Sequence, residues 1–486
     1  MAQAYETVIG LEVHAQLSTG TKIFCGCKTR FGAEPNSQTC PVCLGMPGVL
    51  PVLNKKAVEF AIKLGIATGC RLNRINIFAR KNYFYPDLPK GYQISQFEQP
   101  ICEEGFMDIE AEGKTKRIGI RRIHLEEDAG KLVHAESYVA EDETLVDLNR
   151  CGVPLVEIVS HPDLNSPQEA HDYLFKLRQL LRYLEICDGN MEEGSLRCDA
   201  NISMRPVNSQ KLGVRTELKN MNSFRHVQRA LQYEIDRQTA ILQAGGKVEQ
   251  ETLLWDPERE EARPMRGKEE SHDYRYFPEP DLVAVKITAP WLAQIDDEMP
   301  ELPAAKMKRF MEQYQLSEYE AVIICSSKEM ADYFEQTAQI CTDYKLVGNW
   351  ILGAVSRVLN ERKIEITQIP ITPSRLADLL LAITDQTISA SAAKKIFDEA
   401  LHSEEPITEL IKRSGLAQVS DANALEAFVD QVLQNHPEEV ELYRGGKTKV
   451  LGFLIGQVMK ASAGKANPEM INTIMKKKLD TPQENS

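Results

Sequence analysis

The first 290 residues of the chain contain several short runs in which hydrophobic and polar positions alternate, the pattern of a half-buried β-strand. In the segment 8–14 (VIGLEVH) the large hydrophobic side chains share one face, and Glu12 and His14 share the other. Further strands are predicted by turn-bounded runs at 117–125, 153–159 and 199–203. We therefore expect this part of the chain to be rich in strands.

Two segments in the same part have the three- to four-residue period of an amphipathic helix. One begins at Ser166-Pro167, where the serine predicts an N-cap, the proline the first helical residue and Glu169 a capping box. The other begins at Asn222 or Ser223 and ends at a Gly-Gly pair. These two helices are expected to lie among the strands.

The pattern of hydrophobic and polar positions changes after the proline-rich loop at 277–281. From about residue 291 the chain is a succession of short amphipathic helices, and Thr372-Pro373 and Asn467-Pro468 are again a cap followed by proline. We therefore predict an α+β protein in three parts: a strand-rich domain at 1–290, an all-helical domain at 291–405 and a small helical tail at 406–486.

The composition is that of a globular protein, with 43% hydrophobic and 26% charged residues among 486. No stretch approaches 18 consecutive apolar residues, and the N-terminus shows neither an export nor a transit signal, so we expect a cytoplasmic protein without a membrane span. The formal charge of −14 argues against a protein that coats nucleic acid. Residues 444–478 nevertheless carry eight basic side chains and one acidic one, and this local +7 leaves −21 for the rest.

Four of the eleven cysteines are crowded into Cys25-x-Cys27 and Cys40-x-x-Cys43, with twelve residues between the pairs. Four thiolates on two short loops can close a tetrahedron around Zn²⁺, and the pattern implies no open coordination position. The alternative is four unligated thiols. Because the loop between the pairs is too polar to form a core of its own, a bound metal would explain its order, and we predict a structural zinc site. The scattered remaining cysteines fit a reducing compartment.

A second group of candidate residues offers hard oxygen donors and one imidazole. Such donors suit a site for Mg²⁺ and a nucleotide, where water and phosphate oxygens complete the octahedron. Spacing alone also allows each carboxylate to be a solvated surface group and the histidine to be a hydrogen-bonded core residue. The candidates are Glu12, His14, Glu126, Glu127, Asp199 and Glu217. Two lysines, Lys81 and Lys90, could contact phosphate or line a polar passage.

Several nucleotide and hydrolase motifs are absent from the sequence. It has no complete P-loop, no G-x-G-x-x-G that opens a helix, no G-x-S-x-G elbow, no kinase motif set and no Ser- and Gly-rich amidase stretch. Any ATP chemistry must therefore use a different fold.

Long strings in the sequence are more specific than any of these patterns. They are VIGLEVH (8–14), FGAEPN (31–36), RKNYFYPD (80–87), GYQISQF (91–97), HLEEDAGK (124–131), EEGSLRCDANIS (192–203), DYRYFPEPD (273–281) and GQVMKASAGKANP (456–468). They closely resemble the B subunit of the glutamyl/aspartyl-tRNA amidotransferase, GatB, and the resemblance runs the full length of the chain.

The resemblance implies a transamidase subunit that works in a heterotrimer with an A and a C subunit. Members of that family bind a mischarged tRNA, Glu on tRNA(Gln) or Asp on tRNA(Asn), and phosphorylate the side-chain carboxylate with Mg·ATP. Ammonia from glutamine hydrolysis in the A subunit then arrives through a polar tunnel and displaces phosphate. The fold implied is a cradle domain, a helical domain and a tail of the YqeY type.

The resemblance also implies roles for individual residues. It implies that Glu12, His14, Glu127 and Glu217 are the Mg²⁺ ligands, with Glu126 and Asp199 as close neighbours. It places Lys81 and Lys90 where the ammonia passage meets this site, and it allows the four cysteines a structural zinc. The basic tail fits contact with the RNA backbone, for which the candidates are Lys447, Lys449, Lys460 and Lys465.

Two other functional classes remain as alternatives. One is a zinc-stapled tRNA-binding scaffold subunit without a catalytic site of its own, and the other is a metal-dependent phosphohydrolase. Ammonia-dependent turnover separates the first from the transamidase, and ATP hydrolysis without aminoacyl-tRNA separates the second. A solvated basic surface is the alternative for the tail.

Overall fold

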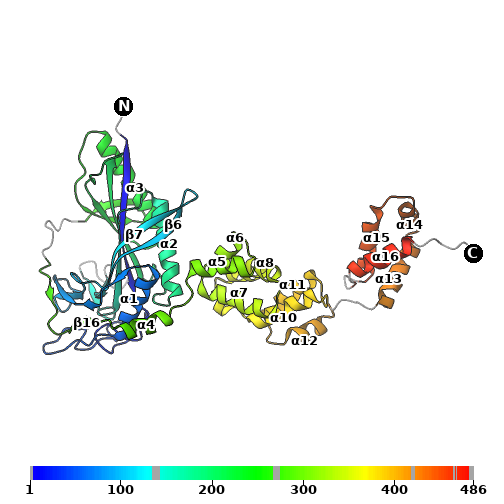
Figure 1. The fold of residues 1–486 in the computed structure, drawn as a ribbon, viewed down its shortest axis with the longest axis horizontal. Coiled ribbons are helices and arrows are strands. Elements are labelled where there is room, and N and C mark those ends of the chain that lie inside the picture. The colour runs from blue at the N-terminus through cyan, green and yellow to red at the C-terminus, as the bar shows by residue number, and fades with distance from the viewer. Residues whose placement is uncertain are drawn as a thin grey trace, which may run out of the picture. The chain divides into compact units, whose positions relative to one another are not determined.

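The computed structural model of the protein describes residues 4–133, 143–265, 274–416, 422–462, 466 and 468–480. The chain forms two compact units, and the division along the chain falls between Pro303 and Ala304. The first unit contains a large β-sheet and the second consists of helices (Figure 1). The predicted α+β class, with a strand-rich N-terminal part followed by helices, is confirmed.

The sheet of the first unit has twelve strands. Its main path runs β14-β13-β12-β11-β1-β10-β7-β5-β4-β15, and β6 and β2 continue from β7. Neighbouring strands are antiparallel except β12 and β13. The strands are β1 (Tyr5–Gln16), β2 (Arg71–Leu72), β4 (Ala79–Asn82), β5 (Tyr92–Ser95), β6 (Cys102–Ala111), β7 (Lys114–Glu127), β10 (Pro154–Ser160), β11 (Leu196–Pro206), β12 (Thr216–Met221), β13 (Thr252–Asp256), β14 (Glu261–Pro264) and β15 (Phe277–Pro278). Two small ladders pair β3 (Ile75–Asn76) with β16 (Val285–Lys286) and β8 (Lys131–Val133) with β9 (Leu145–Asp147).

Strand β1 lies in the middle of the sheet and has the predicted alternation. Ile9, Leu11 and Val13 are at most 1% exposed and belong to the hydrophobic core. Glu12 and His14 point to the opposite face, since successive side chains of a strand alternate between faces. The sheet therefore has one apolar and one polar face.

Helices cover the apolar face. Helix α1 (Lys55–Ala67) packs on β6 and β7, α2 (Pro167–Tyr183) on β6, and α3 (Phe224–Gln243) on β11 and β12. Their apolar side chains join the core of the sheet. The opposite face carries polar side chains, among them Glu12 and His14.

The two predicted helix starts are confirmed, and one detail differs. The hydroxyls of Ser166 and Ser223 each accept a hydrogen bond from the backbone N–H three residues later, at 3.2 and 3.1 Å. Glu169 does not complete a capping box, because its carboxylate accepts the N–H of Asn165, one residue before the cap. It also pairs with Lys116 at 2.7 Å, and this ion pair ties α2 to β7.

The second unit contains two hydrophobic clusters. The first cluster is formed by helices from α5 to α12, and Thr372 caps one of them as predicted. Its helices are α5 (Pro303–Gln313), α6 (Glu318–Ile324), α7 (Lys328–Ile340), α8 (Tyr344–Trp350), η1 (Ile351–Val355), α9 (Ser356–Arg362), η2 (Ile366–Gln368), α10 (Pro373–Thr384), α11 (Ala390–Ala400) and α12 (Ile407–Ser414). The second cluster is formed by α13 (Ala422–Asn435), α14 (Pro437–Arg444), α15 (Val450–Ala461) and α16 (Pro468–Asp480). Asn467, the predicted cap of α16, lies outside the described residues.

The division between the two compact units falls between Pro303 and Ala304, and the predicted boundaries at 290 and 405 can be compared with the packing of the helices beside them. A division at 290 would cut α4 (Ala289–Asp297), whose Ile295 is buried in the core of the first unit. A division at 405 would detach α12, whose Ile407 and Leu410 pack into the first helical cluster. In both cases a short amphipathic helix packs onto the core formed by the residues that precede it in the chain. No helix among the described residues is long and apolar enough to cross a membrane.

Candidate active site and cysteine cluster

The polar face of the sheet gathers ionisable side chains from strands that are far apart in the sequence. His14 on β1 lies opposite Glu157 on β10, and Glu157 lies opposite His124 on β7. Glu126 is two residues beyond His124, so the alternation of β7 places it on the same face. Strand register thus forms a row of two histidines and two carboxylates across three strands.

The distances within this row are short. The Nε2 atom of His14 lies 3.4 Å from Glu157 Oε2 and 3.9 Å from Glu126 Oε1. The Nε2 atom of His124 lies 3.3 Å from Glu157 Oε2 and 3.8 Å from Glu126 Oε2. One donor atom each from His14, Glu126 and Glu157 lies within 4.8 Å of the others. Two hard oxygens and one imidazole nitrogen are therefore available to a single cation.

The protonation of the row reflects its mixed charges. Burial acts to lower the pKa of His14, but its hydrogen bond to Glu157 and the Glu157 charge outweigh burial, so the pKa is raised. Burial also acts to lower the pKa of His124, and Glu157 and Glu126 likewise raise it overall. Burial acts to raise the pKa of Glu157, yet the charge of His124 and the hydrogen bonds of both histidines hold it well below its ordinary value. Without a cation, the two imidazoles supply the positive charge.

A second acidic group adjoins the row on β1, β11 and β12. Lys219 bridges two of its carboxylates, at 2.8 Å from Asp199 and 3.0 Å from Glu217. Asn201 donates a hydrogen bond to Glu12 at 2.9 Å. Burial, followed by the charges of Glu157, Glu217 and Asp199, raises the pKa of Glu12. The negative charges of the row and of the second acidic group therefore both act on Glu12, and the two groups form one electronegative surface.

Lys81 on β4 adds a cation to this surface. Its pKa is raised, because the charge of Glu126 and neighbouring groups outweighs the lowering effect of burial. Its ammonium lies 4.9 Å from the centre of the Tyr274 ring and 5.9 Å from that of Tyr83. Among the described side chains, no ion pair within 4.0 Å engages Lys81. The positive charge is therefore held by aromatic faces and remains available to an anion.

The neighbouring residue Glu127 points to the opposite side of β7. Lys90 forms an ion pair with its Oε1 atom, which also accepts the backbone N–H of Ile94 at 2.8 Å. Glu127 and Lys90 line a cavity of about 200 Å³, and Lys22 and Cys43 line the same cavity. The residues implied as one Mg²⁺ set therefore do not lie together.

The structure divides that set in a specific way. Glu12 and His14 lie on the polar face with Glu217 nearby, whereas Glu127 faces the cavity. Glu126, expected to be a neighbour, is in the row itself. Glu157 was not predicted at all. Its signal in the sequence is a lone acid within the apolar run VPLVEIV, at the position where the strand would face Glu12 and His14 if paired with that strand.

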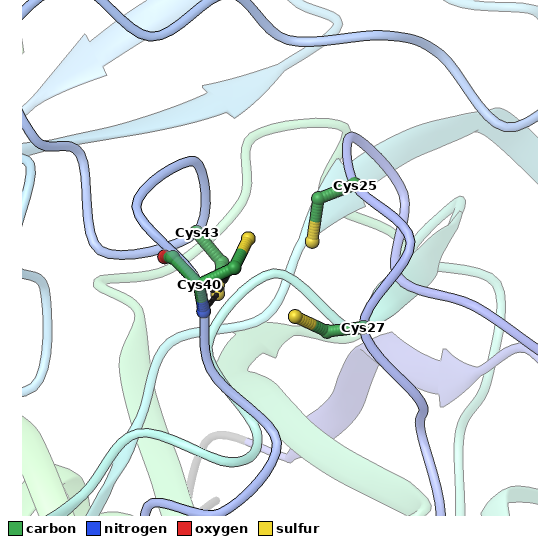
Figure 2. Close-up of side chains that lie close together, drawn as sticks. All are labelled: Cys25, Cys27, Cys40 and Cys43. Atoms are coloured by element: carbon green, nitrogen blue, oxygen red, sulfur yellow. Dashed lines mark hydrogen bonds between the residues drawn. The ribbon is translucent and has the colours of Figure 1, made fainter.

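The four cysteines Cys25, Cys27, Cys40 and Cys43 form the predicted cluster. Two lie on one loop and face the other two across a short gap (Figure 2). All four sulfurs lie within 4.8 Å of one another, and those of Cys40 and Cys43 are 3.9 Å apart. A tetrahedron with Zn–S bonds of about 2.3 Å has sulfurs about 3.8 Å apart. The cluster can therefore hold a soft tetrahedral metal, and all four thiols are free of disulfides.

The cysteine loops pack closely on the segment that carries Lys90. Gly45 has φ of +66°, and a Cβ atom there would overlap with Cγ of Lys90. Both the backbone conformation and the contact require glycine. The backbone N–H of Cys40 donates to Cys43 Sγ at 3.2 Å, and this contact fixes the second pair of sulfurs. The cluster thus holds one wall of the cavity beside Glu127.

The basic tail is a small helical bundle. Lys447, Lys449 and Lys460 are exposed, whereas Lys465 lies outside the described residues. Lys478 is engaged within the bundle, with its ammonium 2.6 Å from the Asp430 carboxylate. The three exposed lysines are therefore the part of the predicted RNA-binding set that the structure places at the surface.

Comparisons with known proteins agree with the architecture. One family model, described as the GatB/GatE catalytic domain, matches residues 7–293, and a second, described as the GatB domain, matches 332–479. The second match begins within α7, well before the predicted tail, and runs through the second helical cluster into α16. The matched range therefore includes the predicted boundary at 405.

Curated relatives match almost the whole chain. The B subunits of the aspartyl/glutamyl-tRNA(Asn/Gln) amidotransferases are 57% identical in Geobacter sp. (strain M21) and 56% identical in Geotalea uraniireducens. Another in Caldanaerobacter subterraneus is 52% identical. Each alignment covers 98% of this chain and 99% of the relative. The chain therefore belongs to the GatB family, the B subunits of the tRNA-dependent amidotransferases, which are glutamine-dependent ligases.

Proposed function

We propose that the polar face of the sheet activates the side-chain carboxylate of a mischarged tRNA, Glu-tRNA(Gln) and/or Asp-tRNA(Asn), for amidation. The observation that carries the proposal is the convergence of His14, Glu126 and Glu157, with the ammonium of Lys81 held close by aromatic rings. Hard donors beside an available cation suit a reaction between a nucleotide phosphate and a carboxylate. Such a reaction belongs in the cytoplasm, where tRNA is used.

The chemistry requires activation because a carboxylate is a poor acyl donor. Transfer of the γ-phosphoryl group of ATP to a carboxylate oxygen gives an acyl phosphate and ADP. Attack of ammonia on the carbonyl carbon then expels inorganic phosphate, leaves the amide and releases a proton. Phosphate is a stable leaving group, whereas oxide is not. The face must therefore bring two anions together, which its cations and a bound metal would allow.

The donor set fits Mg²⁺. His14, Glu126 and Glu157 would hold the ion, and Glu12, Asp199 and Glu217 would border it. Magnesium would neutralise the charge that accumulates as phosphate meets carboxylate. Lys81 would contact the same anions. It would not first have to leave an ion pair, because none of the carboxylates that the structure describes pairs with it. Lys219 would keep Asp199 and Glu217 in place.

Ammonia would reach this face from the opposite side of β7. Lys90 and Glu127 line the cavity there, and their ion pair provides a polar wall. Because the sequence has no amidase motif, we propose that an A subunit supplies the ammonia from glutamine and that a C subunit completes an A·B·C heterotrimer. Lys90 and Glu127 would belong to the passage, and Glu127 would not be a metal ligand.

The cysteine cluster would hold a structural Zn²⁺, since four thiolates leave no position for a substrate. In the tail, Lys447, Lys449, Lys460 and Lys465 would contact the phosphates of the tRNA. Neither site would hold the reacting atoms: the first would shape the cavity wall and the second would bind the substrate.

The test compares two adjacent glutamates in the assembled complex. Glu126→Gln should abolish amidation with free ammonia as donor, because the variant removes a charge from the phosphoryl-transfer site. Glu127→Gln should retain ATP cleavage that depends on mischarged tRNA and should lose amidation preferentially. Normal ammonia-dependent turnover of Glu126→Gln, with tRNA binding intact, would favour the scaffold subunit without its own catalytic site. ATP hydrolysis without aminoacyl-tRNA would favour the phosphohydrolase.

A further inference from the structure

Lys22 is a fully buried lysine that the proposed reaction does not use. Its side chain has 0% exposure, which is rare for an ammonium group. Taking an ammonium out of water is unfavourable unless an anion and hydrogen-bond acceptors replace the water. The protein must therefore supply Lys22 with a counter-charge.

The contacts of the ammonium identify that counter-charge. The Nζ atom of Lys22 donates to Cys43 Sγ at 3.6 Å and to the carbonyl oxygen of Leu148 at 3.3 Å. A carbonyl solvates an ammonium but does not neutralise it. Among the described residues, the carboxylate on the wall beside it, Glu127, is held by Lys90 and the Ile94 N–H. Among the described side chains, the sulfur of Cys43 is therefore the contact of Lys22 that can carry a counter-charge.

The backbone fixes Lys22 between the cysteine cluster and the cavity floor. Its N–H donates to the carbonyl of Cys27 at 2.9 Å, and the next residue, Ile23, donates to the carbonyl of Gly152 at 2.9 Å. Gly152 has φ of +80°, and a Cβ atom there would lie 3.5 Å from Cys43 Cβ and 3.6 Å from Lys22 Cδ. The lysine side chain is therefore held against the second pair of sulfurs.

We propose that Lys22 is a positioning residue of the cysteine cluster that acts as the charge partner of the Cys43 thiolate and retains the metal. The proposal rests on the structural zinc proposed above. Four thiolates around Zn²⁺ carry a net charge of −2, and one buried ammonium reduces this to −1. A thiolate that accepts a charge-assisted hydrogen bond is a poorer target for protons and chelators. Lys22 would thereby also keep the Cys40–Cys43 loop on the cavity wall.

The experiment measures release of metal from the purified full-length chain, not activity. Zinc-loaded wild-type, Lys22→Met and Lys28→Met proteins are mixed with excess chelator, and free zinc is followed with a chromogenic indicator. Lys28→Met is the matched control, because Lys28 is exposed and follows Cys27 directly in the chain. We expect Lys22→Met to release zinc about ten- to a hundredfold faster than wild type, and Lys28→Met to match wild type.

A second variant and a second signal separate this role from simple loss of packing. Lys22→Arg keeps the charge, so it should release zinc more slowly than Lys22→Met. In the Co²⁺-loaded proteins, the thiolate-to-metal absorption should shift in Lys22→Met and remain at its wild-type position in Lys28→Met. If Lys22→Met does not fold, Lys22→Gln is compared with Lys22→Arg in the same assay.

Equal release rates from wild type and Lys22→Met, or from the charged and uncharged variants, would overturn the role of Lys22. Wild-type protein that purifies with less than half an equivalent of zinc and takes up neither Zn²⁺ nor Co²⁺ would instead overturn the metal proposal, and the inference would fail with it. The two failures are distinguished by the metal content of the wild type.

Discussion

The row of two histidines and two carboxylates lies on the opposite side of β7 from the cysteine cluster. The two sites are assembled in different ways. The cluster comes from 19 consecutive residues, 25–43, on two loops. The row of His14, His124, Glu126 and Glu157 comes from three strands and is set by their register. In the cluster the metal would organise the loops, whereas in the row the sheet organises the ligands before any metal arrives.

This difference predicts how each site fails. A site built on loops depends on its metal for order, so loss of a ligand should change local stability first. A site built on paired strands keeps its geometry when one side chain changes, so loss of a ligand should change chemistry first. Substitutions in the two sites should therefore separate stability from activity.

The largest effect is expected in the cluster. Cys43→Ser removes one of four thiolates and should leave the loops without a tightly bound metal. A metal at a thousand times its dissociation constant contributes about 4 kcal/mol, so segment 25–52 should open far more often in the variant. Limited proteolysis with site identification and zinc analysis measure this. Wild-type protection with full zinc content in the variant would contradict it, and Cys70→Ser, outside the cluster, is the control.

The next effect is expected in the row. Glu157→Gln keeps the shape of the side chain but removes the negative charge shared by His14 and His124. If the site loses about 3 kcal/mol of transition-state stabilisation, ammonia-dependent amidation falls at least a hundredfold. Zinc content and protection of 25–52 should stay at wild-type values. A variant with reduced protection and unchanged turnover would reverse the comparison.

The same contrast explains how much could be predicted from the sequence. The cysteine quartet was predicted completely, because ligands that are close in the chain are close in space. The polar face of β1 was also predicted, since alternation needs only a local pattern. Glu157 was missed because its role depends on which strand pairs with β1, and that pairing is set by the whole core. The resemblance implies Glu127 as a ligand and Glu126 as its neighbour, whereas extending the alternation from His124 through the end of β7 places Glu126 on the face of His14.

The domain boundaries show the same limit. Helices α4 and α12 share the amphipathic pattern of the helices that follow them in the chain. Their apolar faces nevertheless pack on the cores formed by the residues that precede them. Helical periodicity predicts that a face is buried and says nothing about its partner. Helical periodicity alone therefore does not decide which core α4 or α12 joins.

A smaller effect is the dependence of stability on pH in metal-free protein. The raised pKa values of His14 and His124 mean that their contribution is present below about pH 6.5 and is lost as the pH rises through the folded-state values. The lowered pKa of Glu157 contributes above about pH 4.5 and is lost as the pH falls. Denaturant midpoints in chelator should fall as the pH rises above about 6.5, and His124→Gln should reduce that fall. An equal fall in His124→Gln would contradict the assignment.

The smallest effect tests whether the tail behaves as a third kind of site, one that is built by charge alone. Lys460 is exposed on α15, whereas Lys478 on α16 is partly buried and paired with Asp430 on α13. Replacing Lys460 by Gln should lower the slope of log affinity against log salt for tRNA by about one, because one phosphate contact is lost. Lys478→Gln removes the same formal charge but should leave the slope nearly unchanged and lower the stability of the bundle instead. Equal slopes for both variants would mean that net charge, and not the exposed position of Lys460, determines binding.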